Sequence, residues 1–301
     1  MIDLATMTTT KNTLSAPAIM LYGLEGIGKT TFGADFPSPY FICAEDGMRN
    51  KIFDGIPRYF PGSFQDILDV LDALATQPNS YKTVVIDTLD AVQKFIFEHI
   101  ARKNNKENIE DIGYGKGYKF AALEIPQLLA RFERLQKKDI AVLLLCHAGI
   151  KNFANPEGEN YDRYVPMLFD SIAAQIKQYV DFILFSTYKV GVDGKKGIGG
   201  KERIIYTEHC AAYDAKSRCE MPEQIPLDAQ TFLSLIGDGA ENGMKKMTDR
   251  IQNLLPSLDD ATKASVKKWL DTKKYTIAAV SRTLKKCEEM AAKNNKEADN
   301  A

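Results

Sequence analysis

The feature that most constrains this chain is a glycine-rich loop, GLEGIGKTT, which begins at Gly23 directly after the apolar run APAIMLY. Its spacing, Gly23-x4-Gly28-Lys29-Thr30, is that of a phosphate-binding loop, in which glycines permit a tight turn and backbone amides surround phosphate oxygens. Such a loop joins a buried strand to the start of a helix. The sequence therefore predicts an α/β fold that holds a nucleoside triphosphate through Gly23, Leu24, Glu25, Gly26, Ile27, Gly28, Lys29, Thr30 and Thr31.

Length and composition bound the class of protein. The chain has 301 residues, 45% of them hydrophobic, which suits one large α/β domain with a small appendage. Its formal net charge of -1 gives no overall basic field, so any nucleic-acid site must be local. It has no apolar run long enough to span a bilayer and no N-terminal secretory pattern, so we expect no membrane partner. Five cysteines without a CxxC pair and only three histidines argue against zinc and favour a reducing cytoplasm.

Short apolar runs alternate with helical patterns along most of the chain. YFICA, YKTVVID and DIAVLLLC are typical of buried strands, and helical segments separate them. VDFILFSTYKV and ERIIYTEHC predict an antiparallel hairpin, whereas residues 149–164 are expected to form a long polar loop. This order predicts a mostly parallel sheet flanked by helices on both faces, with ligands at the carboxyl ends of the strands.

A change in composition marks the expected domain boundary. GDGAENG, residues 237–243, is a linker by composition. We therefore expect a core over residues 1–236, which includes a short leader at 1–16, and a small helical region over 244–301, where Asp259 is an expected N-cap. That region carries 13 Lys and Arg against 8 Asp and Glu, a net charge of +5, and the remainder of the chain then carries -6. Its short helices bury little alone, so they are expected to pack on the core, touch DNA or bind a partner.

The phosphate loop supplies two side chains with specific chemistry. Lys29 would reach the β- and γ-phosphate oxygens, and Thr30 would offer its hydroxyl to Mg²⁺. Asp87 closes an apolar strand and is the natural carboxylate for the same metal ion. ATP and Mg²⁺ are therefore the expected cofactors.

Hydrolysis also needs a group that orients the attacking water. Glu45 fits this role because its strand follows the loop helix directly and ends beside the γ-phosphate, and the adjacent Asp46 competes with it. His147 ends the fourth strand, where a polar side chain could sense the γ-phosphate and relay its presence to the segment that follows.

The order of these segments resembles the RecA-like recombinase core, most closely that of the phage single-strand annealing ATPases of the same superfamily. The matching stretches cover roughly residues 17–236 and are GLEGIGKTT, FICAEDG, VVIDTLDAV, IGYGKGYKFAA, LLLCHAGIKNFANPEGENY and AAYDAKSRCEMP. The resemblance implies a RecA-like P-loop ATPase that binds single-stranded DNA, promotes annealing in DNA recombination and hydrolyses ATP slowly when DNA is bound. It also implies a phage-encoded protein in a bacterial cytoplasm.

The resemblance assigns roles to individual residues. Glu45 would be the carboxylate that activates water, Asp87 the Walker B acid, and His147 the polar switch that reads the γ-phosphate. Lys216 and Arg218 in YDAKSR match a basic pair that reaches into the ATP site of a neighbouring protomer. Cations delivered in this way would neutralise charge on the γ-phosphate. Catalysis would then require a homo-oligomer, either a head-to-tail ring or a filament.

Two segments interleave cations with aromatic rings, and the resemblance identifies them as the two DNA-binding loops. Rings stack on bases and cations meet phosphates, so the pattern itself favours single-stranded nucleic acid, although acidic residues dilute the second segment. The expected contacts are Tyr114, Lys116 and Tyr118 in GYGKGY, and Lys151, Phe153, Tyr161 and Arg163 in KNFANPEGENYDRY.

The sequence departs from the family in ways that favour annealing over strand exchange. We expect no long N-terminal helical domain and no appended DNA-pairing module. A single-strand-binding protein is a further expected partner for the basic C-terminal helices. Two other functions stay open. One is an ATP-driven assembly switch such as a helicase loader, and the other is a small-molecule or nucleotide kinase with the Gly/Lys-rich tip at 191–201 as its lid.

Overall fold

A computed structural model describes residues 16–193, 196–236, 248–272, 279–280, 283–284, 286–287 and 290. The expected linker at 237–243 and nearly all of the expected leader at 1–16 lie outside these residues. Within the described part, no helix is both long and apolar enough to cross a bilayer.

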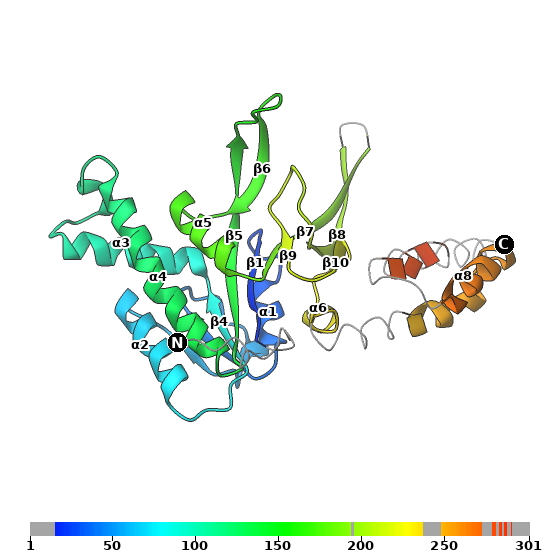
Figure 1. Ribbon diagram of the computed structural model, residues 1–301, viewed down its shortest axis with the longest axis horizontal. Coiled ribbons are helices and arrows are strands. Elements are labelled where there is room, and N and C mark those ends of the chain that lie inside the picture. The colour runs from blue at the N-terminus through cyan, green and yellow to red at the C-terminus, as the bar shows by residue number, and fades with distance from the viewer. Residues whose placement is uncertain are drawn as a thin grey trace, which may run out of the picture.

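One twisted sheet organises the described part of the core, and ten strands take part in it (Figure 1). The strand order is β10-β8-β7-β1-β5-β4-β2-β3, with β6 paired to β5 and β9 paired to β7. The strands are β1 Ala18–Gly23, β2 Pro39–Cys43, β3 Arg58–Tyr59, β4 Thr83–Asp87, β5 Ala141–Phe153, β6 Tyr161–Pro166, β7 Phe182–Asp193, β8 Lys196–Tyr206, β9 Lys216–Ser217 and β10 Gln224–Pro226.

The centre of the sheet is parallel and its margin on the β10 side is antiparallel. Strand β1 lies between β5 and β7 and runs parallel to both, and β5, β4, β2 and β3 continue the parallel part. Strands β7, β8 and β10 pair antiparallel. The expected hairpin of β7 and β8 is therefore confirmed, as is the expected class of a mostly parallel α/β sheet. Residues 194–195, at the tip of that hairpin, lie outside the described residues.

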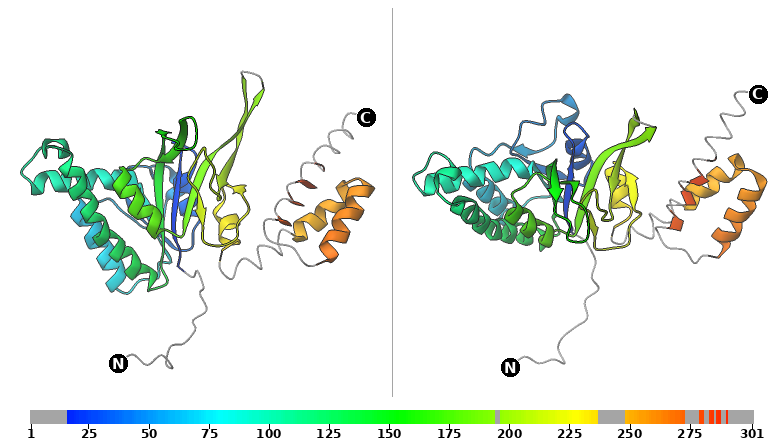
Figure 2. Two further views of the ribbon diagram at one scale, coloured as in Figure 1. Left: turned by 45° about the horizontal axis from the view of Figure 1, so that its top comes forward. Right: turned by 90° about the horizontal axis from the view of Figure 1, so that it is seen from above.

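Helices cover both faces of the sheet, as Figures 1 and 2 show. One apolar cluster packs α2, α3, α4 and α5 on one face, and a second packs α1 and α6 on the other. Successive residues of β1 point to opposite faces of the sheet, so that Met20 and Tyr22 pack in the first cluster and Ile19 and Leu21 in the second. Because both faces of β1 are buried, the strand is apolar throughout. The helices are α1 Lys29–Ala34, α2 Phe64–Thr76, α3 Leu89–Lys103, α4 Lys116–Gln136, α5 Asp170–Tyr179 and α6 Ala229–Leu233, with short 3-10 turns η2 Lys51–Phe53 and η3 Ile109–Asp111.

The C-terminal region has a small apolar cluster of its own, built from residues between Ile251 and Met290. It contains the 3-10 turn η4 Leu255–Ser257 and helix α8 Asp260–Asp271. The expected N-cap at Asp259 is confirmed, because its carboxylate accepts the Thr262 amide at 2.9 Å.

The segment expected to be a long polar loop at 149–164 is instead mostly a β-hairpin. Strand β5 continues past the sheet to Phe153 and pairs antiparallel with β6, so that Lys151 lies opposite Arg163 and Phe153 opposite Tyr161. A ribbon that projects beyond the sheet buries little, so it lacks the apolar alternation from which strands are predicted. Cross-strand aromatic and polar pairs favour it instead.

Candidate active site

The phosphate loop leaves the sheet at Gly23 and leads into α1. Gly23 pairs with His147 of β5 on one side and with Ser186 of β7 on the other. A Cβ added to Gly23 would lie 2.1 Å from the Ser186 hydroxyl oxygen, so no larger residue fits there. Gly26 and Gly28 have φ angles of 68° and 113°, which favour glycine. The loop geometry therefore requires the glycines from which it was predicted.

Lys29 lies inside the loop with only 6% of its surface exposed. Its ammonium donates to the carbonyl oxygens of Gly23 at 3.1 Å and Leu24 at 3.0 Å. Burial lowers the pKa of Lys29, while the nearby carboxylates of Asp87 and Asp90 act in the opposite direction. Two carbonyls of the loop thus hold the Lys29 ammonium against the loop backbone.

Thr30 and Asp87 bring two oxygen donors together beside the loop. The Thr30 hydroxyl donates to Oδ2 of Asp87 at 2.9 Å. Asp87 is 4% exposed, and burial raises the pKa of its carboxyl group. A bound divalent cation would offset the free-energy cost of a buried negative charge on Asp87. Hydroxyl and carboxylate oxygens are also ligands that Mg²⁺ prefers. The pair therefore fits the magnesium site expected from the sequence.

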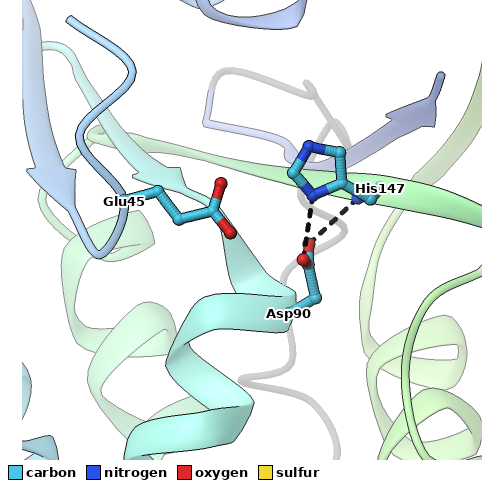
Figure 3. A group of neighbouring side chains, drawn as sticks. All are labelled: Glu45, Asp90 and His147. Carbon is cyan, nitrogen blue, oxygen red and sulfur yellow. Dashed lines mark hydrogen bonds and ion pairs between the residues drawn. The ribbon is translucent and has the colours of Figure 1, made fainter. Parts of the chain in front are cut away.

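Of the two acidic residues after β2, Glu45 is the one directed toward the other polar groups of the site. Its amide donates to the Asp87 carbonyl at 3.1 Å, which draws the chain across the end of β4. Its carboxylate, the Asp90 carboxylate and the His147 ring have atoms that all lie within 4.8 Å of one another (Figure 3). Asp46 is exposed and accepts from Nε of Arg49 at 2.6 Å. The geometry therefore places Glu45, and not Asp46, among the other polar groups of the site, and its role in orienting water stays a prediction.

Asp90 is a site residue that the sequence pattern did not reveal. It lies in the first turn of α3 and is 5% exposed. Oδ2 contacts Nδ1 of His147 at 2.9 Å, and Oδ1 accepts the His147 amide at 2.9 Å (Figure 3). The signal in the sequence was weak, because an acid in the first turn of a helix is common for helix stability alone.

The Asp90–His147 contact shifts the pKa of both groups toward their charged forms. Burial by itself raises the pKa of Asp90, but the hydrogen bonds from the His147 ring and amide outweigh it and lower that pKa to about 2. The same hydrogen bond raises the pKa of His147 above its ordinary value. The ring is therefore held with its Nδ1 side fixed on Asp90 and with a tendency to carry a proton.

The first predicted DNA-binding segment is a turn followed by a helix. Tyr114 is fully exposed in a left-handed turn, and Lys116 is exposed at the first residue of α4. Tyr118 is not an open loop residue: its ring stacks on Phe169 at a centroid distance of 4.5 Å, and its hydroxyl donates to Glu110. One face of this ring is therefore already covered within the chain.

The second predicted segment is the β5–β6 hairpin. Lys151 is exposed, and its Nζ lies 2.5 Å from Oδ2 of Asp170. The ring centroids of Phe153 and Tyr161 are 5.2 Å apart. Arg163 is not an open surface cation, because it is 11% exposed on its side chain and pairs with Asp214 while lying 5.4 Å from the Phe153 ring centroid. Arg163 could contact DNA only by exchanging these contacts, and its role as a nucleic-acid contact stays a prediction.

Lys216 and Arg218 lie at the opposite end of the sheet from the phosphate loop of their own chain. Strand β9 pairs with β7 at Phe182 and Ile183, whereas the loop begins beside Ser186. The Lys216 ammonium donates to the carbonyls of Lys177 at 2.9 Å and Val180 at 2.6 Å. Arg218 pairs with Asp181 at 3.0 Å. Both cations are therefore engaged within their own chain, and a role at a neighbouring protomer stays a prediction.

Comparison with known proteins gives the family. The crystal structure of flagellar accessory protein FlaH from Methanocaldococcus jannaschii is similar at 12% identity and a TM-score of 0.33, over 63% of this chain and 76% of that chain. That score is too low to support an argument. No curated protein matches the chain. A family model described as an AAA domain matches residues 15–219, which is more than half of the chain and includes the whole site. The chain therefore belongs to the AAA domain family, as a P-loop protein of the nucleotide-binding ATPase kind.

Proposed function

We propose that this protein binds and hydrolyses ATP with Mg²⁺, binds single-stranded DNA and promotes single-strand annealing. The observation that carries the proposal is the position of His147. It lies on β5 between the phosphate site and the β5–β6 hairpin, and its carbonyl accepts the Met167 amide just after β6 at 2.8 Å. A group that reads the nucleotide and a ribbon that could bind DNA therefore share one strand.

At the phosphate end, each residue of the chain has a distinct task. Thr30 and Asp87 would hold Mg²⁺, which supplies positive charge that stabilises the transferring phosphoryl group. Lys29 neutralises charge on the β- and γ-phosphate oxygens. Glu45 accepts a hydrogen bond from the attacking water and orients it. His147, held by Asp90, offers its other ring nitrogen to the γ-phosphate side of the site.

At the DNA end, the two aromatic segments are physically linked. Tyr118 of α4 stacks on Phe169, which lies three residues after the end of β6 and whose amide donates to the Gln93 side chain at 2.6 Å. In this proposal, the rings of Tyr114, Phe153 and Tyr161 stack on bases, and Lys116 binds a phosphate. Each stacked base would contribute about 1–3 kcal/mol.

Assembly into a head-to-tail homo-oligomer is part of the proposal. Lys216 and Arg218 lie far along the sheet from the phosphate loop of their own chain, so they could act on ATP only in a neighbouring protomer. Their present carbonyl and Asp181 contacts would have to be exchanged for phosphate contacts. This requirement supports slow turnover, and it is also the one observation that favours the second candidate, an ATP-driven assembly switch.

The test is ATP hydrolysis with and without single-stranded DNA at two salt concentrations. We expect DNA to raise the rate, the stimulation to fade at higher salt, and Lys29→Ala to abolish hydrolysis. Tyr114→Ala should lose stimulation, while Tyr59→Ala, an exposed tyrosine on the distant edge strand β3, should keep it. Tight ATP binding with negligible turnover, even with DNA, would favour the switch. No DNA binding at all would refute the recombination role.

A further inference from the structure

Arg203 lies on the opposite side of the phosphate loop from the acidic residues. A Cβ added to Gly28 would lie 3.1 Å from Nη1 of Arg203 and 3.6 Å from Cδ2 of Leu227. Both residues come from the antiparallel margin, Arg203 from β8 opposite Tyr188 and Leu227 from the segment just after β10. The Leu227 amide donates to the Arg203 carbonyl at 3.0 Å, so the two positions are held together. A cation and an apolar side chain therefore border the loop at Gly28.

The guanidinium of Arg203 is not used elsewhere in the described part of the structure. Arg203 is exposed, and no acidic side chain among the described residues pairs with it. Its neighbours on the same hairpin, Lys189 and Glu202, pair with each other at 3.0 Å. An unpaired guanidinium beside a loop that already contains the Lys29 ammonium is repelled by it, unless an anion lies between the two cations. The arrangement therefore points to an anionic ligand.

Strand order shows which part of that ligand Arg203 meets. Glu45, Asp87 and His147 follow or belong to β2, β4 and β5, on one side of β1. Arg203 belongs to β8, on the other side of β1. The carboxylates and the magnesium donors mark the end of the phosphate chain at which hydrolysis takes place. A phosphate chain held by residues 23–31 would therefore turn its α-phosphate and ribose toward β8.

We propose that Arg203 binds the α-phosphate of the nucleotide within its own chain, with Leu227 against the ribose or base. A guanidinium forms paired hydrogen bonds with two phosphate oxygens, which suits an anchor that fixes orientation. Because the α-phosphate is common to ATP and ADP, the anchor acts on both nucleotides equally and leaves hydrolysis to the other end. The proposal rests on nucleotide binding as proposed above and adds the residue that holds its non-reacting end.

The test is the affinity for ATP and for ADP, each with Mg²⁺, measured by titration calorimetry. Removal of a hydrogen bond between a protein and a charged ligand group weakens the affinity for that ligand by about tenfold. We expect Arg203→Ala to weaken the binding of ATP and of ADP by about tenfold each, and Arg203→Lys to weaken both by less. The matched control is Lys189→Ala, which removes a cation from the same hairpin and should leave both affinities as in the parent. Circular dichroism melting curves of the variants establish that the fold is kept.

The outcomes separate this inference from the proposed function. If Lys29→Ala loses nucleotide binding but Arg203→Ala behaves like Lys189→Ala, the inference is overturned and the nucleotide site stands. If Arg203→Ala weakens ATP but not ADP, the α-phosphate assignment is overturned, because the contact would be to the γ-phosphate. If the parent protein binds neither nucleotide, the proposed function itself fails.

Discussion

Replacing Asp90 with asparagine removes one charge from the site while keeping the size of the side chain. In the parent, burial raises the pKa of Asp90, but its hydrogen bonds with His147 outweigh burial and lower that pKa from 3.8 to about 2. A pKa change of that size means that the folded protein stabilises the ionised form of Asp90, relative to the protonated form, by about 2 kcal/mol. In Asp90→Asn the amide oxygen can still accept the His147 backbone amide, but no negative charge remains to favour an imidazolium. We therefore expect the pKa of His147 to fall.

The pH dependence of stability follows from the two pKa directions. The pKa of Asp90 is lowered in the folded protein. Its contribution to the free energy of unfolding is therefore complete above its ordinary pKa near 4 and is lost as the pH falls through about 2. The pKa of His147 is raised in the folded protein. Its contribution to the free energy of unfolding is therefore complete below its ordinary pKa of 6.5 and is lost as the pH rises through its pKa in the folded protein. The ion pair thus stabilises the fold most between about pH 4 and 6.5. Asp90→Asn should cost about 2 kcal/mol at pH 5 and less at pH 8.

Two measurements check this prediction. A ¹H–¹⁵N NMR titration follows the imidazoles, of which the chain has only three, and His147→Asn identifies the relevant signal. Urea unfolding at pH 5 and pH 8 gives the free energy of unfolding. The matched control is Asp72→Asn, because Asp72 pairs with two arginines, Arg131 and Arg134, and not with a histidine. An unchanged His147 titration in Asp90→Asn, or a stability loss equal at both pH values, would refute the reasoning.

Three further predictions concern the site and its support. Glu45→Gln should lower ATP hydrolysis by about 100-fold or more, whereas Asp46→Asn should stay near the parent rate; equal losses in a steady-state assay would contradict the choice of Glu45. Thr30→Ala should raise the Mg²⁺ concentration needed for half-maximal hydrolysis, and an unchanged Mg²⁺ titration would count against the assignment. Tyr22→Phe should cost about 1–3 kcal/mol in urea unfolding, because the Tyr22 hydroxyl exchanges two hydrogen bonds with the backbone of Asp214, at 2.7 and 2.9 Å; no measurable loss would contradict this.

The parts of the fold that the sequence predicted well are those specified by neighbouring residues. Strands β1, β2 and β4 are short apolar runs that end at turn or loop signals, and the phosphate loop joins β1 to α1 through glycines at the required positions. The carboxyl ends of parallel strands meet at one edge, so the strand pattern alone was enough to place Glu45 and Asp87 together. Local pattern and a topological rule were sufficient there.

The parts that escaped prediction depend on contacts between distant segments. Asp90 and His147 are 57 residues apart, and nothing near Asp90 distinguishes a site residue from an acid in a helix start. The β5–β6 ribbon lacks a buried face, so its polar residues gave no strand signal. The partners of Lys216 lie 36 and 39 residues away in sequence, and Arg163 pairs with Asp214 across 51 residues. Such pairings follow from tertiary packing, which a local pattern does not encode.

The measurement that tests the central claim most directly is the affinity for a fluorescent single-stranded oligonucleotide in different nucleotide states. Anisotropy titrations would compare ATP with Mg²⁺, ADP with Mg²⁺ and no nucleotide, for the parent and for Lys29→Ala. If His147 and β5 couple the phosphate site to the hairpin, ATP should tighten DNA binding by about fivefold or more, and Lys29→Ala should show no nucleotide effect. An affinity that is the same in all three states of the parent, or no binding in any of them, would contradict the account.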